Sequence, residues 1–168
     1  MAMTHSYKGL PMNADDISTA DVAEPCEALL LDNQLCFALY STSLLMTKVY
    51  KPLLQALGLT YPQYLAMMVL WEQDGLTVGD VSTRLLTDPG SLTPLLKRLE
   101  GEGFITRTRS KEDERVVLLR LTEQGRALQQ RARQVPGCIL SASGLDLEKL
   151  QKIQSDLLQL RGNLREHV

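Results

Sequence analysis

Apolar side chains recur every three or four residues along most of the chain, which is the period of an amphipathic helix. A first helix carries apolar residues at 35, 39, 45, 46, 49 and 53, and we expect Asp32 to cap it, Pro52 to bend or restart it and Gly58 to end it. Start and stop residues predict further helices at about 61–73, at 78–86, at 89–101, from Thr122 to Pro136-Gly137, and from Asp146 onward.

Three of these helices begin with recognisable capping residues. Thr60 and Gln63 have the spacing of a capping box, Thr77 precedes the next helix, and Asp88-Pro89 opens the one after it. That third helix has an apolar stripe made by Leu92, Leu95, Leu96 and Leu99. The stripe leaves a polar face outward, made by Ser91, Thr93, Lys97 and Arg98.

After this helix the period changes to that of strands. The runs "GFITRTRS" and "RVVLLRLT" flank the charged turn "KEDE" and predict a β-hairpin. Two short helices followed by a hairpin is the order of a winged helix-turn-helix. Such a helix can enter the major groove of DNA while Lys97 and Arg98 reach phosphates, and a basic hairpin tip can lie along the minor groove. A helical domain with an incidental hairpin is the alternative.

Charge supports DNA binding only weakly. The 168 residues have a formal net charge of −2, with 44% hydrophobic and 23% charged residues, as in an ordinary globular domain. Residues 1–36 carry −5, whereas 97–133 hold ten Lys/Arg against six acids. A solvated charged face explains an excess of that size as well. Residues 1–28 are polar and unpatterned, and predict a flexible tail.

Several classes of protein are disfavoured. No apolar run approaches the roughly 18 residues that a membrane span needs, and the N-terminus lacks a secretory pattern, so we expect a cytoplasmic protein with no membrane partner. Cys26, Cys36 and Cys138 form no CxxC, and both histidines lie near the chain ends. The sequence therefore predicts no metal site, no disulfide framework and no cofactor.

The last predicted helix has an unusually apolar face. We call this face the α-seam; it consists of Leu150, Ile153, Leu157, Leu160 and Leu164 at alternating spacings of three and four. It is too hydrophobic for a lone surface helix, and it predicts packing against another long helix.

The stretch "DPGSLTPLLKRLEGEGFITRTRSKEDERVVLLRLTEQG" resembles the MarR family of dimeric bacterial transcription regulators. With "LDNQLCFALYSTSLLMTKVYKPLLQALGLTYPQY" before it, the chain is similar to the OhrR branch, the organic-hydroperoxide-sensing repressors, over about residues 29–165. The resemblance implies a mainly α protein with a small β-hairpin wing. It also implies a homodimer on operator double-stranded DNA, with a tail (1–28), a helical dimerisation region (29–60 and 122–168) and a winged helix-turn-helix (61–121).

The resemblance also implies roles for single residues. Cys36 matches the cysteine that organic hydroperoxide oxidises to a sulfenic acid, which leads to release from DNA. Tyr50 and Tyr61 match two tyrosines that hydrogen-bond the reactive sulfur of the partner subunit. Arg115 matches a wing arginine that enters the minor groove, and Asp113 the acid that holds it. Cys138 resembles a second cysteine that some members use to resolve the sulfenic acid across the dimer.

The spacing of Cys36 and Tyr50 bears on this assignment. They are 14 residues apart, so on one helix they stand roughly 21 Å from each other, which a tyrosine side chain cannot span. If they meet, they belong to different chains. From the residues alone, Cys36 as an inert core cysteine and the tyrosines as residues at the edge of a core remain open, although a position near a helix start favours thiolate.

Three functions are therefore compared. The preferred one is a redox-sensing repressor, not an enzyme, which leaves DNA when Cys36 is oxidised and forms an intersubunit disulfide with Cys138. The second is a MarR-type repressor that responds to a small apolar or aromatic ligand, with Cys36 structural. The third is a thiol peroxidase, for which a CxxC or an acid–base set beside Cys36 is missing.

Overall fold

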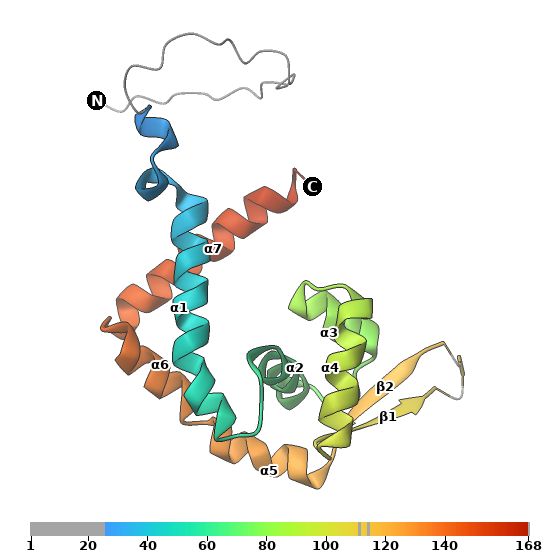
Figure 1. Cartoon of the computed structure of the whole chain (residues 1–168). Helices are drawn as coiled ribbons and strands as arrows, with labels where there is room; N and C mark the ends of the chain where they lie inside the picture. The colour runs from blue at the N-terminus through green and yellow to red at the C-terminus, as the bar shows by residue number, and fades with distance from the viewer. Residues whose placement is uncertain (1–25, 111, 114, 168) are drawn as a thin grey trace. The chain divides into compact units, whose positions relative to one another are not determined.

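The computed structural model describes residues 26–110, 112–113 and 115–167 (Figure 1). The predicted tail lies outside the described residues except for its last three positions. The chain divides into two units, residues 1–40 and 41–168, and each is treated by itself below.

The N-terminal unit consists of two 3-10 turns and the start of the first long helix. The elements are η1 (Glu27–Leu29), η2 (Leu31–Asn33) and α1 (Leu35–Gln55), which continues into the second unit. The prediction that Asp32 caps α1 is wrong, because Asp32 lies inside η2. Leu30 and Gln34 are extended, and the Gln34 side-chain amide donates to the carbonyls of Ala28 (2.6 Å) and Leu30 (3.2 Å). The Asn33 and Gln34 backbone amides donate to the carbonyls of Leu30 and Leu31, three residues earlier, so this segment is a 3-10 turn and α1 begins only at Leu35.

The second unit contains the predicted helix-turn-helix, made by α2 (Tyr61–Glu72), α3 (Val78–Leu85) and α4 (Pro89–Gly101). Each predicted cap is confirmed. The Thr60 amide donates to Gln63 Oε1 at 2.8 Å, Thr77 Oγ1 accepts from the Asp80 amide, and Asp88 accepts from the Ser91 amide. Upstream, Pro52 lies inside α1 without ending it.

The wing is a two-stranded antiparallel hairpin of β1 (Ile105–Arg109) and β2 (Val117–Leu121). It is joined to the segment before α3, because the Leu119 amide donates to the Leu76 carbonyl at 2.8 Å and Thr77 forms a bridge with Leu118. The apolar stripe of α4 and the base of the hairpin share one core, which includes Leu92, Leu96, Leu99, Ile105 and Leu119. The predicted fold class is confirmed.

Beyond the wing lie α5 (Glu123–Ala132) and α6 (Val135–Ser143). The predicted helix break at Pro136-Gly137 is misplaced, since both residues belong to the first turn of α6. Proline has no N–H, and its ring collides with the carbonyl four residues earlier, which here belongs to Ala132. The break therefore falls at residues 133–134, and Cys138 lies in a helix instead of beside a loop.

The last helix, α7 (Leu147–Arg165), begins where predicted, with the Asp146 carboxylate accepting from the Lys149 amide at 2.8 Å. None of its 19 residues is buried. In the α-seam, Ile153 is 46% exposed and Leu164 is 57% exposed. Among the described residues, no helix combines the length and apolar character that a membrane span requires.

Candidate DNA interface and redox site

The outer face of α4 presents the polar residues that the sequence predicted. Ser91, Lys97 and Arg98 are exposed, whereas Thr93 is half-buried and its hydroxyl donates to the Pro89 carbonyl at 3.0 Å. Two cations and a small hydroxyl residue are therefore presented to solvent from one helix. A helix with this surface is suited to phosphate and groove contacts.

The tip of the wing is held by Asp113, though not in the way the resemblance implied. Its carboxylate accepts from the backbone amide of Arg115 at 2.9 Å, and its carbonyl accepts from the Val116 amide at 2.9 Å. Among the ion pairs formed by described residues, none joins the side chains of Asp113 and Arg115. An aspartate bonded to the amide two residues on is an Asx turn, which fixes the tip and leaves Arg115 exposed.

One contact between α4 and the wing was missed by the sequence analysis. The Arg107 guanidinium lies 3.6 Å from the Glu100 carboxylate, and the Arg107 amide donates to the same carboxylate at 3.1 Å. In the alternation of β1, Arg107 shares a face with the buried Ile105, and that pattern could have shown that its side chain turns inward. This pair links α4 directly to the wing.

The two predicted sensor tyrosines are brought together, and a third joins them. The rings of Tyr50 and Tyr61 have centroids 4.8 Å apart, and those of Tyr50 and Tyr64 lie at 6.2 Å. Tyr64 was missed, although it follows Tyr61 by three residues on the same helix, a spacing that places two side chains on one face. The site is thus a cluster where α1 meets the start of α2.

Two tyrosines of this cluster, Tyr50 and Tyr64, have raised pKa values. Burial raises the pKa of Tyr50 to about 12, and the neighbouring Tyr61 and Tyr64 add to the effect. Burial, followed by the proximity of Tyr61, also raises the pKa of Tyr64 above its ordinary value. At neutral pH both hydroxyls remain protonated, so they can donate hydrogen bonds to an anion.

The cysteines are exposed free thiols. Cys36 is the second residue of α1, and its exposure argues against the core-filler alternative within this chain. Cys138 lies in the first turn of α6, with its amide bonded to the Gln134 carbonyl at 3.2 Å. Across the part of the chain that the structure describes, no cluster of three or more potential metal ligands occurs.

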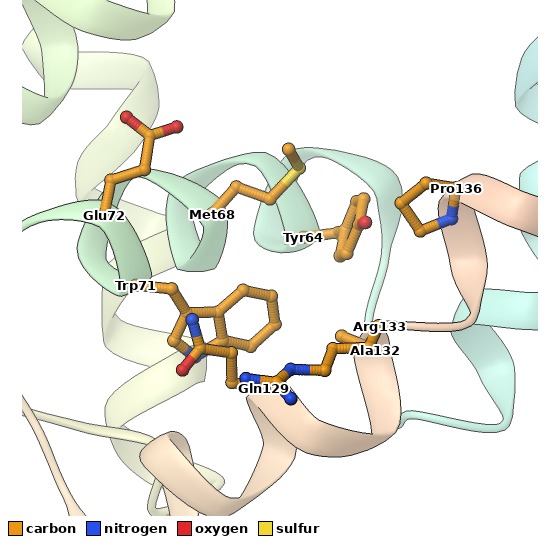
Figure 2. A pocket seen from close by; sticks show the side chains of 8 residues that line it. All are labelled: Tyr64, Met68, Trp71, Glu72, Gln129, Ala132, Arg133 and Pro136. Carbon is orange, nitrogen blue, oxygen red and sulfur yellow. The ribbon is translucent and has the colours of Figure 1, made fainter. Parts of the chain in front are cut away.

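A shallow hollow of about 220 Å³ lies between α2 and α5 (Figure 2). Tyr64 and Trp71 line its α2 side, and Gln129 and Arg133 line its α5 side. Trp71 also donates its indole N–H to the Gly125 carbonyl at 2.8 Å. Sequence analysis assigned no role to this tryptophan.

Known proteins resemble this chain in sequence and in structure. A sequence profile for the transcriptional regulators SarA/Rot matches residues 48–132. The organic hydroperoxide resistance transcriptional regulator of Bacillus subtilis (strain 168) is 52% identical over 136 residues, which make up 81% of this chain and 92% of that protein.

Two solved structures of AbfR, a protein of Staphylococcus epidermidis, are also similar. Reduced AbfR bound to DNA is 34% identical with a TM-score of 0.68, covering 80% of this chain and 94% of that chain. Disulfide-formed AbfR is 34% identical with a TM-score of 0.56, covering 81% of this chain and 90% of that one. These relatives are DNA-binding regulators and not enzymes. The chain therefore belongs to the MarR family of winged-helix transcription regulators, in the OhrR branch of organic hydroperoxide regulators.

Proposed function

We propose that this protein represses transcription as a reduced homodimer on operator DNA and leaves the operator when organic hydroperoxide oxidises Cys36. The observation that carries the proposal is an exposed thiol in the first turn of α1, in a chain 52% identical to an organic hydroperoxide resistance regulator. The residues 29–60 and 122–168 form the dimerisation region of this proposal, and 61–121 read the DNA.

The first chemical step takes place at the Cys36 sulfur. The thiolate attacks the terminal peroxide oxygen of R–O–OH, an S–O bond forms and the O–O bond breaks. The sulfur is oxidised to a sulfenic acid, and the peroxide is reduced to an alkoxide that takes a proton and leaves as the alcohol.

Tyr50 and Tyr61 serve the reduced state of the sensor. Their hydroxyls donate to the Cys36 thiolate of the partner subunit, since the spacing along α1 excludes a contact within one chain. The raised pKa of Tyr50 supports this role, because a phenol that keeps its proton remains a donor. Oxidation converts the anionic acceptor into a neutral sulfenic acid and weakens those hydrogen bonds.

Cys138 is the proposed resolving residue. Its thiol condenses with the sulfenic acid of Cys36 on the other subunit, forming an S–S bond and releasing water. The exposure of Cys138 in α6 supports this step, and AbfR provides a relative whose structure is known in a disulfide form. A disulfide requires Cα atoms within about 7 Å, so helices that stand farther apart must move to form it.

DNA contacts come from α4 and the wing. In this proposal Ser91 and Thr93 face the major groove, Lys97 and Arg98 bind phosphates, and Arg115 enters the minor groove from the tip that Asp113 shapes. Changing Arg115 to alanine should weaken operator binding and lower the salt dependence by about one counterion. Unchanged binding at low salt would remove the wing from the interface.

A mobility-shift titration on the gene's upstream DNA tests the central claim, with and without cumene hydroperoxide. The wild-type protein should release DNA on oxidation, and Cys36→Ser should bind equally well but not respond. Cys26→Ser is the matched control and should behave like the wild type. If Cys36→Ser still releases DNA on oxidation, Cys36 is not the sensor. If the wild type does not respond, the ligand-sensing alternative takes its place.

A non-reducing gel tests the role of Cys138 separately. Peroxide should produce a covalent dimer that dithiothreitol reverses, and Cys138→Ser should abolish that band while initial oxidation of Cys36 continues. A dimer band that persists in Cys138→Ser would identify Cys26 as the partner.

A further inference from the structure

We infer that Tyr64, Trp71 and Asp74 connect the sensor tyrosines to the base of the wing, and that Trp71 is a positioning residue of the switch. The inference rests on the proposed function, because it concerns how oxidation at Cys36 reaches the DNA-binding surface. All the contacts that carry it lie within the second unit of the chain.

The connection begins with aromatic contacts along α2. Tyr50 contacts Tyr61 and Tyr64, and the Tyr64 ring meets Trp71 edge to face, with centroids 6.2 Å apart and an interplanar angle of 70°. Tyr64 and Trp71 are seven residues apart, so they lie on one face of the helix two turns from each other. A displacement at the tyrosine cluster therefore has a packed route to the far end of α2.

At that end, hydrogen bonds replace ring contacts. The Trp71 indole donates to the Gly125 carbonyl at the start of α5. Asp74 accepts from the Leu121 amide at the end of β2 (2.8 Å) and from the Arg126 guanidinium of α5 (2.7 Å). One short segment thus holds both the last residue of the wing and the helix that follows it.

The Asp74 contacts are strong ones for a partly exposed group. Burial opposes ionisation, but the bonds from the Leu121 amide, from Arg126 and from the Gly75 amide outweigh it and lower the pKa of the carboxyl. Bonds to a charged acceptor are roughly twice as strong as neutral ones. Asp74 therefore binds the end of β2 and the start of α5 strongly. Trp71 lies between Asp74 and Tyr64 along the chain and contacts the Tyr64 ring.

The surroundings of Trp71 leave it room to change position. The hollow of about 220 Å³ opens beside its ring, between α2 and the Gln129 and Arg133 side chains of α5 (Figure 2). Cores are close-packed, and an aromatic ring enclosed on all sides has one arrangement. A ring that is half-buried beside open space can adopt a second arrangement when its neighbour Tyr64 shifts.

Trp71 is the only tryptophan of the chain, so fluorescence excited at the long-wavelength edge of indole absorption, where the five tyrosines absorb little, reports on this residue alone. In the full-length protein, cumene hydroperoxide should change the emission of Trp71, and the change should be lost in Cys36→Ser. A wild-type protein that releases DNA on oxidation with unchanged Trp71 emission would overturn the inference. This measurement needs no variant at position 71.

Trp71→Phe tests the role of the indole N–H, because it keeps an aromatic ring and deletes the donor. Reduced operator affinity should stay within about two-fold and the rate of Cys36 oxidation should not change. The loss of affinity on oxidation should shrink by about five-fold, within the usual range of coupling effects. Met68→Leu, which lines the same hollow and has no such donor, is the matched control and should respond like the wild type.

The outcomes separate the two proposals. If the wild-type protein stays on DNA after oxidation, the proposed function fails. If the wild type is released and Trp71→Phe is released to the same extent, the proposed function stands and the role of Trp71 is refuted.

Discussion

The helix-turn-helix with its wing and the C-terminal helix α7 differ in whether their apolar side chains are buried. Both use the same local device, a capping side chain at the helix start, in Thr77 for α3 and Asp146 for α7. Their burial is opposite. Three of the four leucines in the stripe of α4, Leu92, Leu96 and Leu99, are at most 2% exposed, whereas α7 has no buried residue. Local signals are therefore enough to start a helix, but an apolar face needs a surface to pack on.

In the first region that surface is supplied by the same chain, through β1, β2 and α2. For α7, the described part of the single chain buries none of its residues. The proposed homodimer supplies that surface, because a second copy brings a second α-seam and the exposed apolar residues of the N-terminal unit. Each side chain buried there gains roughly 1.5–3 kcal/mol.

The largest expected effect comes from placing a charge in the α-seam. Ile153→Glu should give a monomer in sedimentation equilibrium and lower operator affinity by about 100-fold, because a carboxylate in an apolar interface has no partner. Gln154→Glu introduces the same charge one residue away, off the seam, and should remain dimeric. A dimeric Ile153→Glu protein would place the interface elsewhere.

Two glycines give the second test, Gly125 of α5, which lies against the residue before β1, and Gly162 of α7. At Gly125 a Cβ would overlap the carbonyl oxygen of Phe104, whereas at Gly162 in α7 nothing lies within 4 Å. In urea denaturation, Gly125→Ala should destabilise the fold by about 2–3 kcal/mol. Gly162→Ala should stabilise it by about 0.5–1 kcal/mol, as alanine favours a helix over glycine. If Gly162→Ala also lowered the free energy of unfolding, α7 would be closely packed at that position too.

Removing a cap should have a smaller effect. Thr77→Ala deletes the acceptor of the Asp80 amide and should lower the free energy of unfolding by about 1 kcal/mol. Thr77→Ser keeps the oxygen and should retain most of that stability. If both variants lose the same amount, the threonine methyl group rather than the cap is responsible.

The smallest effects appear at the extremes of pH. Because the pKa of folded Tyr50 is about 12 against an ordinary value of 10.0, its contribution is complete below pH 10 and is lost as pH rises toward 12. Tyr50→Phe should reduce that loss in denaturation measured across this range.

In α7, the bonds from Lys149 lower the pKa of Asp146, so its contribution is present above pH 3.8 and falls in stronger acid.

Sequence predicted the elements best where a cap and a stop lie close together. The bounds of α2, α3 and α4 follow directly from Thr60, Thr77 and Asp88. Asp32 failed as a cap because it lies within a 3-10 turn, whose backbone bonds join residues three apart, and α1 begins only after that turn. Pro136 failed as a breaker because a proline disturbs the turn before it and is well tolerated in a first turn.

Sequence predicted which residues form the candidate site better than it predicted the contacts between them. The contact between Tyr50 and Tyr61 joins α1 to α2. The resemblance indicated it, because it assigned both tyrosines to the same sulfur. Trp71 and Asp74 were missed because their partners, Gly125, Leu121 and Arg126, lie some 50 residues away. The bond of Asp113 to a backbone amide was missed because composition does not distinguish a turn from an ion pair.

The attachment of β2 to the segment before α3 limits the spacing of base pairs in an operator that α4 and the wing bind as proposed. With the Leu119 amide bonded to the Leu76 carbonyl and Arg107 paired with Glu100, the wing is fixed to the segment before α3 and to α4. In the proposed function, α4 and the wing then read a half-site as one block of set length, and we expect a base pair inserted within a half-site to weaken binding. A base pair inserted between half-sites instead rotates one block against the other by roughly 34°, since the duplex repeats about every 10.5 base pairs.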